Sequence, residues 1–298
     1  MNYALDALWW RLTDPSVRDL AAILTAPPLW QNRHELPVRT LLGETGFRFL
    51  LALDKQPEAL HSYLAAQSPF GHRLGFYAES LAAFWFSHAP HCRLSAQNLQ
   101  VCSEDGRTLG AADFFALING KPYHVELTCK YYGSHSGKPE DMAGLNTRDR
   151  LTDKAEKLVR QLELLKTPQG QAALKQTGIT HSDFQTASII RGIGFSATGR
   201  PQRDTLLNPY GWSGLYMADW AGYKEQPSEN KRYCLLQNTD YLAPARVPEN
   251  RAVGHAEIVS AEQGLIAVLE RRPDGFWHET ARLMKRSGTG AADANSHD

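Results

Sequence analysis

Two acidic residues, Asp113 and Glu126, lie at equal distances on either side of the dipeptide Asn119-Gly120. Asn-Gly between two apolar and β-branched runs is typical of a two-residue β-hairpin loop, which pairs Ile118 with Lys121. Five positions further from the loop on each side, this register places Asp113 opposite Glu126, with Cβ atoms about 4.5–5.5 Å apart. Directly opposed like charges destabilise a sheet, so such carboxylates either share a proton or hold a cation.

The faces of this hairpin follow from the alternation of side chains along a strand. One face is predicted to be polar around the carboxylates, and the other apolar. The polar face carries Asp113, Phe115, His124, Glu126, Thr128 and Lys130, and the apolar face carries Ala112, Phe114, Val125, Leu127 and Cys129. A β-bulge before residue 113 would shift this register by one residue and remove the pairing.

Other elements are needed to position the hairpin, and their apolar periodicity predicts them. The expected order is a helix from Leu74 to His88 that carries Glu79, three strands in an antiparallel meander, a helix that carries Lys154, and a further strand. In residue numbers, the three strands are 97 to 103, 108 to 118 and 121 to 132, the second helix is 149 to 166, and the last strand is 187 to 195.

The segments before and after this core have weaker patterns. Residues 1–72 are interpreted as a helical extension, in which Asp14-Pro15 begins a helix. Residues 73–200 form the core, and residues 201–285 a β-rich extension whose aromatic-rich pieces have no clear period. The tail, residues 286–298, is small and polar and is predicted to be disordered.

Composition limits the classes of function. Hydrophobic residues make up 42% of the 298 residues, and 32 basic residues balance 32 acidic ones. A nucleic-acid partner would therefore have to bind a local basic patch. No apolar run reaches membrane-spanning length, and a cytoplasmic location is expected. The four cysteines have no C-x-x-C spacing, which argues against a disulfide framework and a zinc ribbon.

The order helix, three strands, helix, strand resembles the αβββαβ core of the PD-(D/E)XK nuclease-like superfamily. Four more specific motifs are similar to a bacterial domain-of-unknown-function family, number 1853. They are Leu74-Gly75-x-Tyr77-x-Glu79, Leu109-Gly110-x-x-Asp113-Phe114, Glu126-Leu127-x-x-Lys130-Tyr131-Tyr132 and Asn146-x-x-Asp149-Arg150-Leu151-x-x-Lys154. The resemblance implies an α/β fold with a central four-stranded mixed sheet flanked by helices.

The resemblance also implies roles for individual residues. Asp113 and Glu126 would hold Mg²⁺ or Mn²⁺, and Glu79 resembles a helix glutamate that assists the metal in some members of the superfamily. The superfamily lysine stands two residues after the glutamate, where this chain has Thr128, so Lys130 is the expected replacement on the same strand face. Phosphate contacts are expected from the basic side of the second helix, which carries Arg150, Lys154, Lys157 and Arg160.

The sequence therefore predicts a metal-dependent nuclease that cleaves phosphodiester bonds in nucleic acid, with DNA favoured over RNA. One alternative is a catalytically inactive protein of the same fold that binds nucleic acid or a protein partner, in which the displaced lysine marks a lost site. Another is a structural or assembly protein whose aromatic-rich C-terminal region contacts a partner, because aromatic residues are enriched at interfaces. The sequence leaves the oligomeric state open.

Overall fold

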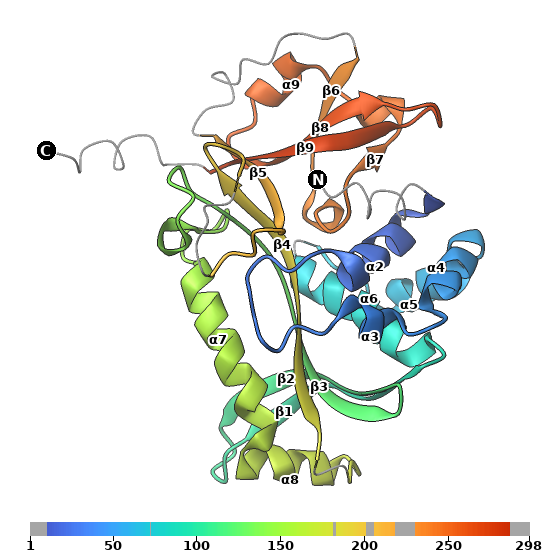
Figure 1. The fold of residues 1–298 in the computed structure, drawn as a ribbon, viewed down its shortest axis with the longest axis vertical. Helices are drawn as coiled ribbons and strands as arrows, with labels where there is room; N and C mark the ends of the chain where they lie inside the picture. The colour runs from blue at the N-terminus through green and yellow to red at the C-terminus, as the bar shows by residue number, and fades with distance from the viewer. Residues whose placement is uncertain (1–10, 72, 181–182, 201–205, 218–229, 287–298) are drawn as a thin grey trace, which may run out of the picture. The chain divides into compact units, whose positions relative to one another are not determined.

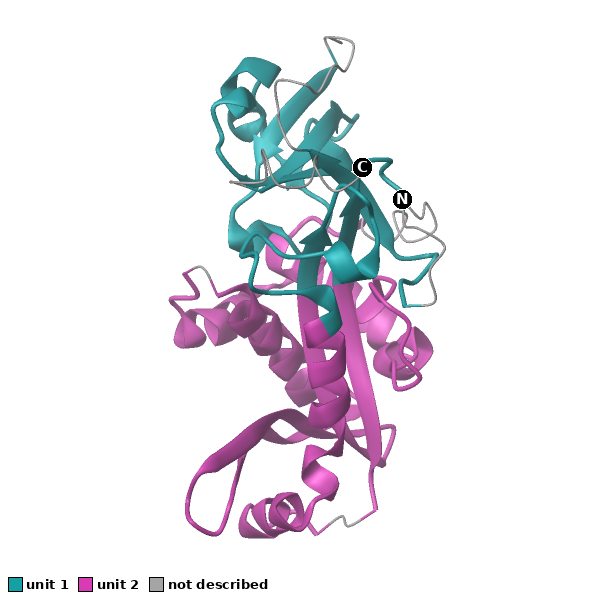
Figure 2. Cartoon of the chain, turned by 90° about the vertical axis from the view of Figure 1, so that its left-hand side faces the viewer, with its two compact units in different colours: residues 1–2, 130–152, 192–298 teal, residues 3–129, 153–191 magenta. Residues whose placement is uncertain are grey.

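A computed structural model describes residues 11–71, 73–180, 183–200, 206–217 and 230–286 (Figure 1). The chain divides into two compact units, coloured in Figure 2. Unit 2 contains residues 3–129 and 153–191, and unit 1 contains residues 1–2, 130–152 and 192–298. The predicted disordered tail beyond residue 286 lies outside the described residues.

Unit 2 begins with helices that precede the sheet. They are α2 (Pro15–Thr25), α3 (Val38–Leu42), α4 (Gly46–Lys55), α5 (Glu58–Gln67) and α6 (Leu74–His88). Asp14 caps α2 as the sequence predicts, since its carboxylate accepts the N–H of Val17 at 3.0 Å and satisfies a donor at the helix start. The helix α6, which carries Glu79, has the bounds that its apolar spacing predicts.

Three antiparallel strands follow, and they form the predicted meander. The strands are β1 (Cys92–Cys102), β2 (Thr108–Ile118) and β3 (Lys121–Gly133). Asn119 and Gly120 have φ values of +51° and +76°, the left-handed conformations of a type I′ turn. The predicted register is confirmed from the Ile118–Lys121 pair to the Phe114–Val125 pair.

The hairpin turn gives a prediction about folding. An added Cβ at Gly120 would meet no atom within 4 Å, so an alanine there would be disfavoured only by its backbone conformation. We expect Gly120→Ala to lower the free energy of unfolding by about 1 kcal/mol, measured by urea denaturation. An unchanged midpoint would mean that the turn does not constrain the hairpin.

The sequence predicts one polar and one apolar face for this hairpin, and in the structure residues of both faces are buried. Phe114 packs on Phe86 of α6 with ring centroids 5.3 Å apart. On the opposite face, Phe115 packs on Phe184 at 5.4 Å and belongs to a buried cluster with Leu165. The strand is buried because helical segments cover it on both sides, and the acidic residues are therefore placed partly inside the unit rather than on a solvated edge.

The second covering layer begins with the helix that carries Lys154. Its elements are α7 (Leu151–Glu163), the 3₁₀ turn η2 (Leu164–Lys166), α8 (Pro168–Gln176) and then β4 (Gln185–Ser196). The turn η2 packs closely on β2, because a Cβ at Gly110 would lie 3.0 Å from Leu164 Cδ2. The absence of a side chain at Gly110 thus lets the end of α7 lie against the strand that carries Asp113.

Unit 1 contains the remaining strands and short helices. They are β5 (Trp212–Met217), β6 (Lys231–Leu235), β7 (Arg246–Val247), β8 (Gly264–Arg271), β9 (Trp277–Lys285), α9 (His255–Val259), and the 3₁₀ turns η1 (Pro139–Asp141), η3 (Asn238–Asp240) and η4 (Glu249–Arg251). The strand β5 pairs in parallel with both β4 and β9, and β8 pairs antiparallel with β9 and with β6.

The fold is therefore a mixed α/β fold, but the sheet is larger than the four strands that the sequence predicts. It contains nine strands in the order β1-β2-β3-β4-β5-β9-β8-β6, with β7 paired to β9. The extra strands come from the C-terminal segment, which continues the sheet from β4 instead of forming a separate one. Among the described residues, no helix is long and apolar enough to cross a membrane.

Candidate functional site

The ladder between β2 and β3 opens where the two acidic residues lie. The last paired residues are Phe114 and Val125. Beyond them, the N–H of Asp113 donates to Glu126 Oε1 at 3.3 Å, and the N–H of Leu127 donates to Asp113 Oδ2 at 2.8 Å. Each carboxylate thus takes a backbone donor that an opposing carbonyl would otherwise receive, and the two acidic side chains are held together within unit 2.

Glu126 has a second partner within its own strand. His124, two residues earlier, lies 2.7 Å from Glu126 Oε1 through Nε2. The side chains of His124 and Glu126 are 0% and 1% exposed. Burial of a carboxylate is unfavourable unless hydrogen bonds compensate, and Oε1 has two such contacts.

One oxygen of each carboxylate remains available. Within the described part of the chain, neither Asp113 Oδ1 nor Glu126 Oε2 accepts a hydrogen bond. Carboxylate oxygens are the ligands that hard divalent cations prefer. Within the described residues, the arrangement leaves two such oxygens without a protein partner, one on the half-buried Asp113 and one on the buried Glu126.

The electrostatics of the pair favour a proton or a cation. Burial, followed by the neighbouring Glu126 carboxylate, raises the pKa of Asp113 from 3.8 to about 8; Glu79 raises it further, whereas the Leu127 N–H and Lys154 lower it. Burial and Glu126 also raise the pKa of Glu79, and Lys154 opposes that rise. Three carboxylates and one ammonium therefore interact at one place in unit 2.

Lys154 differs from the other basic residues of its helix. It is half-buried, and its charge acts on Asp113 and Glu79. Lys157 and Arg160 are exposed, and Arg160 lies 4.0 Å from Glu156 on the helix surface. Arg150, which precedes α7, is exposed and donates to the carbonyl of Glu140. The structure thus brings only Lys154 of this basic group to the carboxylates.

Lys130 has a different partner from the one the sequence suggests. In unit 1, its ammonium donates to Asp149 Oδ2 at 2.6 Å, and both side chains are about one-third exposed. The hydroxyl of Tyr132 donates to the other oxygen of Asp149 at 2.9 Å. Asp149 therefore holds Lys130 in a local ion pair that is reinforced by a tyrosine.

Ligand count limits the kind of metal site that this chain could form. Among the described residues, no group of three or more His, Cys, Asp or Glu side chains could hold a metal ion. A site built only from protein ligands is thus not present in that part of the chain. Magnesium commonly uses one or two carboxylates and completes its coordination with water and substrate phosphate, which fits the pair Asp113 and Glu126.

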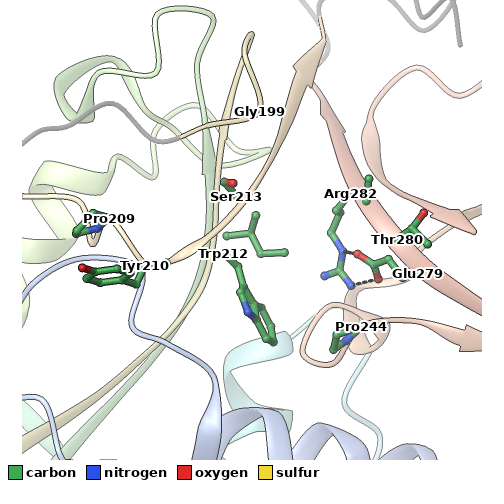
Figure 3. Close-up of a pocket in the computed structure, with 12 residues that line it drawn as sticks. Gly199, Pro209, Tyr210, Trp212, Ser213, Pro244, Glu279, Thr280 and Arg282 are labelled. Carbon is green, nitrogen blue, oxygen red and sulfur yellow. Dashed lines mark hydrogen bonds and ion pairs between the residues drawn. The ribbon is translucent and has the colours of Figure 1, made fainter. Parts of the chain in front are cut away.

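A separate cavity of about 420 Å³ lies within unit 1 (Figure 3). Its lining includes Tyr210, Trp212 and the buried pair Glu279–Arg282. Arg282 donates to both oxygens of Glu279, at 2.7 and 2.6 Å, and also to backbone carbonyls. Glu279 and Arg282 compensate each other's charge and are the charged side chains among the described lining residues, so unit 2 holds the stronger candidate for phosphate chemistry.

Sequence reasoning did not predict the contact of His124 with Glu126 or the place of Lys154 beside the carboxylates. The sequence did contain a sign of the contact between His124 and Glu126, since positions two apart on a strand share a face. The signal for Lys154 was also present, because it stands three residues after Leu151 and four before Leu158, which are both buried. Residues at this spacing share one face of a helix, so Lys154 belongs to the side that meets the sheet.

Comparison with known proteins identifies one family. The family described as "Domain of unknown function (DUF1853)" matches residues 18–284. No curated protein and no solved structure matches the chain. The match includes every residue of the candidate site.

Proposed function

Because the chain belongs to the DUF1853 family, whose description states no activity, we propose its function from the site: metal-dependent hydrolysis of phosphodiester bonds in nucleic acid. The observation that carries this proposal is the pair formed by the half-buried Asp113 and the buried Glu126. Among the described residues, each carboxylate is anchored by a backbone N–H and keeps one oxygen free of hydrogen bonds. Two carboxylates held this close favour a shared proton or a bound cation.

The order of elements supports the same proposal. The order α6, β1, β2, β3, α7, α8 and β4 resembles the αβββαβ core of the PD-(D/E)XK nuclease-like superfamily, with α8 as an additional helix, and we propose that the chain is a member of that superfamily. In that arrangement Asp113 and Glu126 would hold Mg²⁺ or Mn²⁺, with Glu79 nearby. When bound, the cation lowers the pKa of a coordinated water and offsets charge on the phosphate.

The side chains of the protein have separate roles in this proposal. Burial and the neighbouring Glu126 raise the pKa of Asp113 to about 8, so Asp113 would release a proton on becoming a ligand of the cation. Lys154 supplies a positive charge beside Asp113 and Glu79, where it would stabilise negative charge that develops on the phosphate. We assign this role to Lys154 in preference to Lys130, which Asp149 holds. Lys157 and Arg160 would contact the backbone of the nucleic acid, with DNA as the expected substrate.

A nuclease assay on the purified protein tests this proposal. The wild-type protein should cleave DNA oligonucleotides in Mg²⁺ or Mn²⁺, and chelation should stop the reaction. Glu126→Gln should reduce the rate at least about 10³-fold, because it removes the charge that holds the cation. Glu58→Gln, at an exposed position of α5, is the matched control and should retain full activity.

The pairing of Lys130 also favours a second candidate, a protein of the same fold that binds nucleic acid without cleaving it. In that case, binding would persist without metal and no oligonucleotide would be cut. A partner-binding role for the C-terminal aromatic residues has less support. Tyr216, Tyr233 and Trp277 are buried in unit 1, whereas Tyr210 is 82% exposed.

A further inference from the structure

A histidine is hydrogen-bonded to one of the two site carboxylates inside unit 2. His124 and Glu126 lie two residues apart on β3, so their side chains project to the same face. Their contact is 2.7 Å between His124 Nε2 and Glu126 Oε1, and the side chains are 0% and 1% exposed. The environment of the other ring nitrogen, Nδ1, shows what the histidine contributes at this position.

The second ring nitrogen of His124, Nδ1, is buried and has no hydrogen-bond partner among the residues that the structure describes. The ring lies opposite Phe115 in the β2–β3 register, and its centroid is 6.5 Å from that of Phe184. A buried polar atom without a partner is unfavourable, and an apolar side chain would pack among these rings without that penalty. The bond to Glu126 is therefore the contribution that distinguishes a histidine at this position.

The contacts of Glu126 indicate which group donates. Oε1 also accepts the N–H of Asp113 at 3.3 Å, so this oxygen acts as an acceptor. His124 then carries its proton on Nε2 and donates it to Oε1, and Nδ1 has no hydrogen that would need an acceptor. The two donors hold one oxygen of the carboxylate and restrict rotation of the group, while no described residue donates a hydrogen bond to Oε2.

We propose that His124 is a positioning residue, which holds Glu126 Oε1 so that Oε2 is presented to a divalent cation. The inference rests on the proposed function, because it assigns Glu126 as a ligand. Ligating carboxylates are commonly held by hydrogen bonds from residues that do not touch the metal, and loss of such a bond typically weakens metal affinity 10- to 100-fold. His124 itself would not contact the cation.

The test compares two substitutions that differ in the donor. His124→Gln places an amide N–H near the position of Nε2, whereas His124→Phe keeps a planar ring but has no donor. Binding of Mn²⁺ to the metal-free protein is measured by isothermal titration calorimetry. We expect His124→Phe to weaken binding roughly 10- to 100-fold and His124→Gln to stay within about threefold of wild type.

His91 provides a matched control in the same unit. Its Nε2 bonds to the carbonyl of Leu41 at 2.8 Å, and its Nδ1 is likewise buried without a partner. His91→Phe should affect the melting temperature without changing Mn²⁺ affinity. If circular dichroism shows that His124→Phe does not fold, His124→Asn replaces it in the test. The shorter amide of Asn does not reach Glu126, so the same loss of Mn²⁺ affinity is expected.

The outcomes separate this inference from the proposed function. If wild type and His124→Phe bind Mn²⁺ equally, His124 has only a packing role and the inference is wrong, while the metal site stands. If His124→Gln binds as weakly as His124→Phe, the hydrogen bond is not the cause, and the inference also fails. If wild type binds no Mn²⁺, both this inference and the proposed metal-dependent function are overturned.

Discussion

Replacing Asp113 by Asn is expected to stabilise the metal-free protein at pH 8 and to remove any stabilisation by Mg²⁺. Burial and the Glu126 carboxylate raise the pKa of Asp113 to about 8 in the folded protein, against 3.8 for the free side chain. Between these values the folded state binds more protons than the unfolded state, so stability falls as the pH rises from about 4 to about 8. Asparagine carries no charge and avoids this loss.

The expected size of the effect follows from the shift in pKa. Each pKa unit corresponds to about 1.4 kcal/mol of unfolding free energy. Because Asp113 interacts with Glu126, a single substitution recovers only part of this free energy. We expect a gain on the order of 2 kcal/mol at pH 8 and a much smaller one at pH 5. Urea denaturation in the presence of a chelator, at both pH values, measures it.

Addition of Mg²⁺ completes this test. A cation that binds only the folded state raises stability by mass action, by about 2.7 kcal/mol at a concentration 100 times its Kd. Wild type should show this rise at pH 8, and Asp113→Asn should not. The opposite pattern, in which the metal-free variant is less stable than wild type and Mg²⁺ affects neither, would mean that Asp113 forms a structural ion pair with Lys154.

The second large effect concerns Lys154 and Lys130, the two candidates for the residue that stabilises negative charge on the phosphate. Lys154→Met is expected to lower kcat about 10²- to 10³-fold, the usual result of removing one preorganised positive or hydrogen-bonding group from the developing charge. Lys130→Met is expected to change kcat only a few-fold, because Lys130 is paired with Asp149 at 2.6 Å. Methionine keeps most of the aliphatic chain and removes the charge in both variants.

Single-turnover cleavage of a DNA oligonucleotide measures both rates, and melting temperatures show whether either protein is destabilised. Loss of the partly exposed Lys130–Asp149 pair should cost about 1 kcal/mol. If Lys130→Met lost activity and Lys154→Met retained it, Lys130, the strand lysine that the sequence suggests, would be the residue that stabilises negative charge on the phosphate. The assignment of Lys154 would then be wrong.

The sequence was most informative where local chemistry determines structure. The Asn119-Gly120 turn fixes the hairpin register, and the apolar spacing of residues 74–88 fixes α6, so both were predicted. The register prediction extended one step too far. At Asp113 the side-chain carboxylates take the backbone donors, and periodicity gives no sign of that competition.

The parts that sequence reasoning did not recover depend on contacts distant in the chain. The strand β5 has six residues and pairs in parallel with β4 and β9. Parallel strands are not joined by a hairpin turn, so no turn motif in the sequence indicates this strand. The spacing of Leu151, Lys154 and Leu158 predicts that they share a face of α7, but what this face meets depends on tertiary packing, including the approach of Leu164 in η2 to Gly110 of β2. That packing places Lys154 beside the carboxylates, whereas Lys130 is held by Asp149.

Because the ladder opens beyond Phe114 and Val125, the interaction between β2 and β3 at this end depends on the protonation of two carboxylates. At this end of the hairpin, β2 and β3 are joined through the carboxylates of Asp113 and Glu126 rather than only through peptide groups. A carboxylate changes its strength as an acceptor when it gains a proton or a cation, and a peptide carbonyl does not. Fraying of the strand ends and binding of a proton or cation by these carboxylates are therefore expected to be thermodynamically linked, so that each would change the free energy of the other.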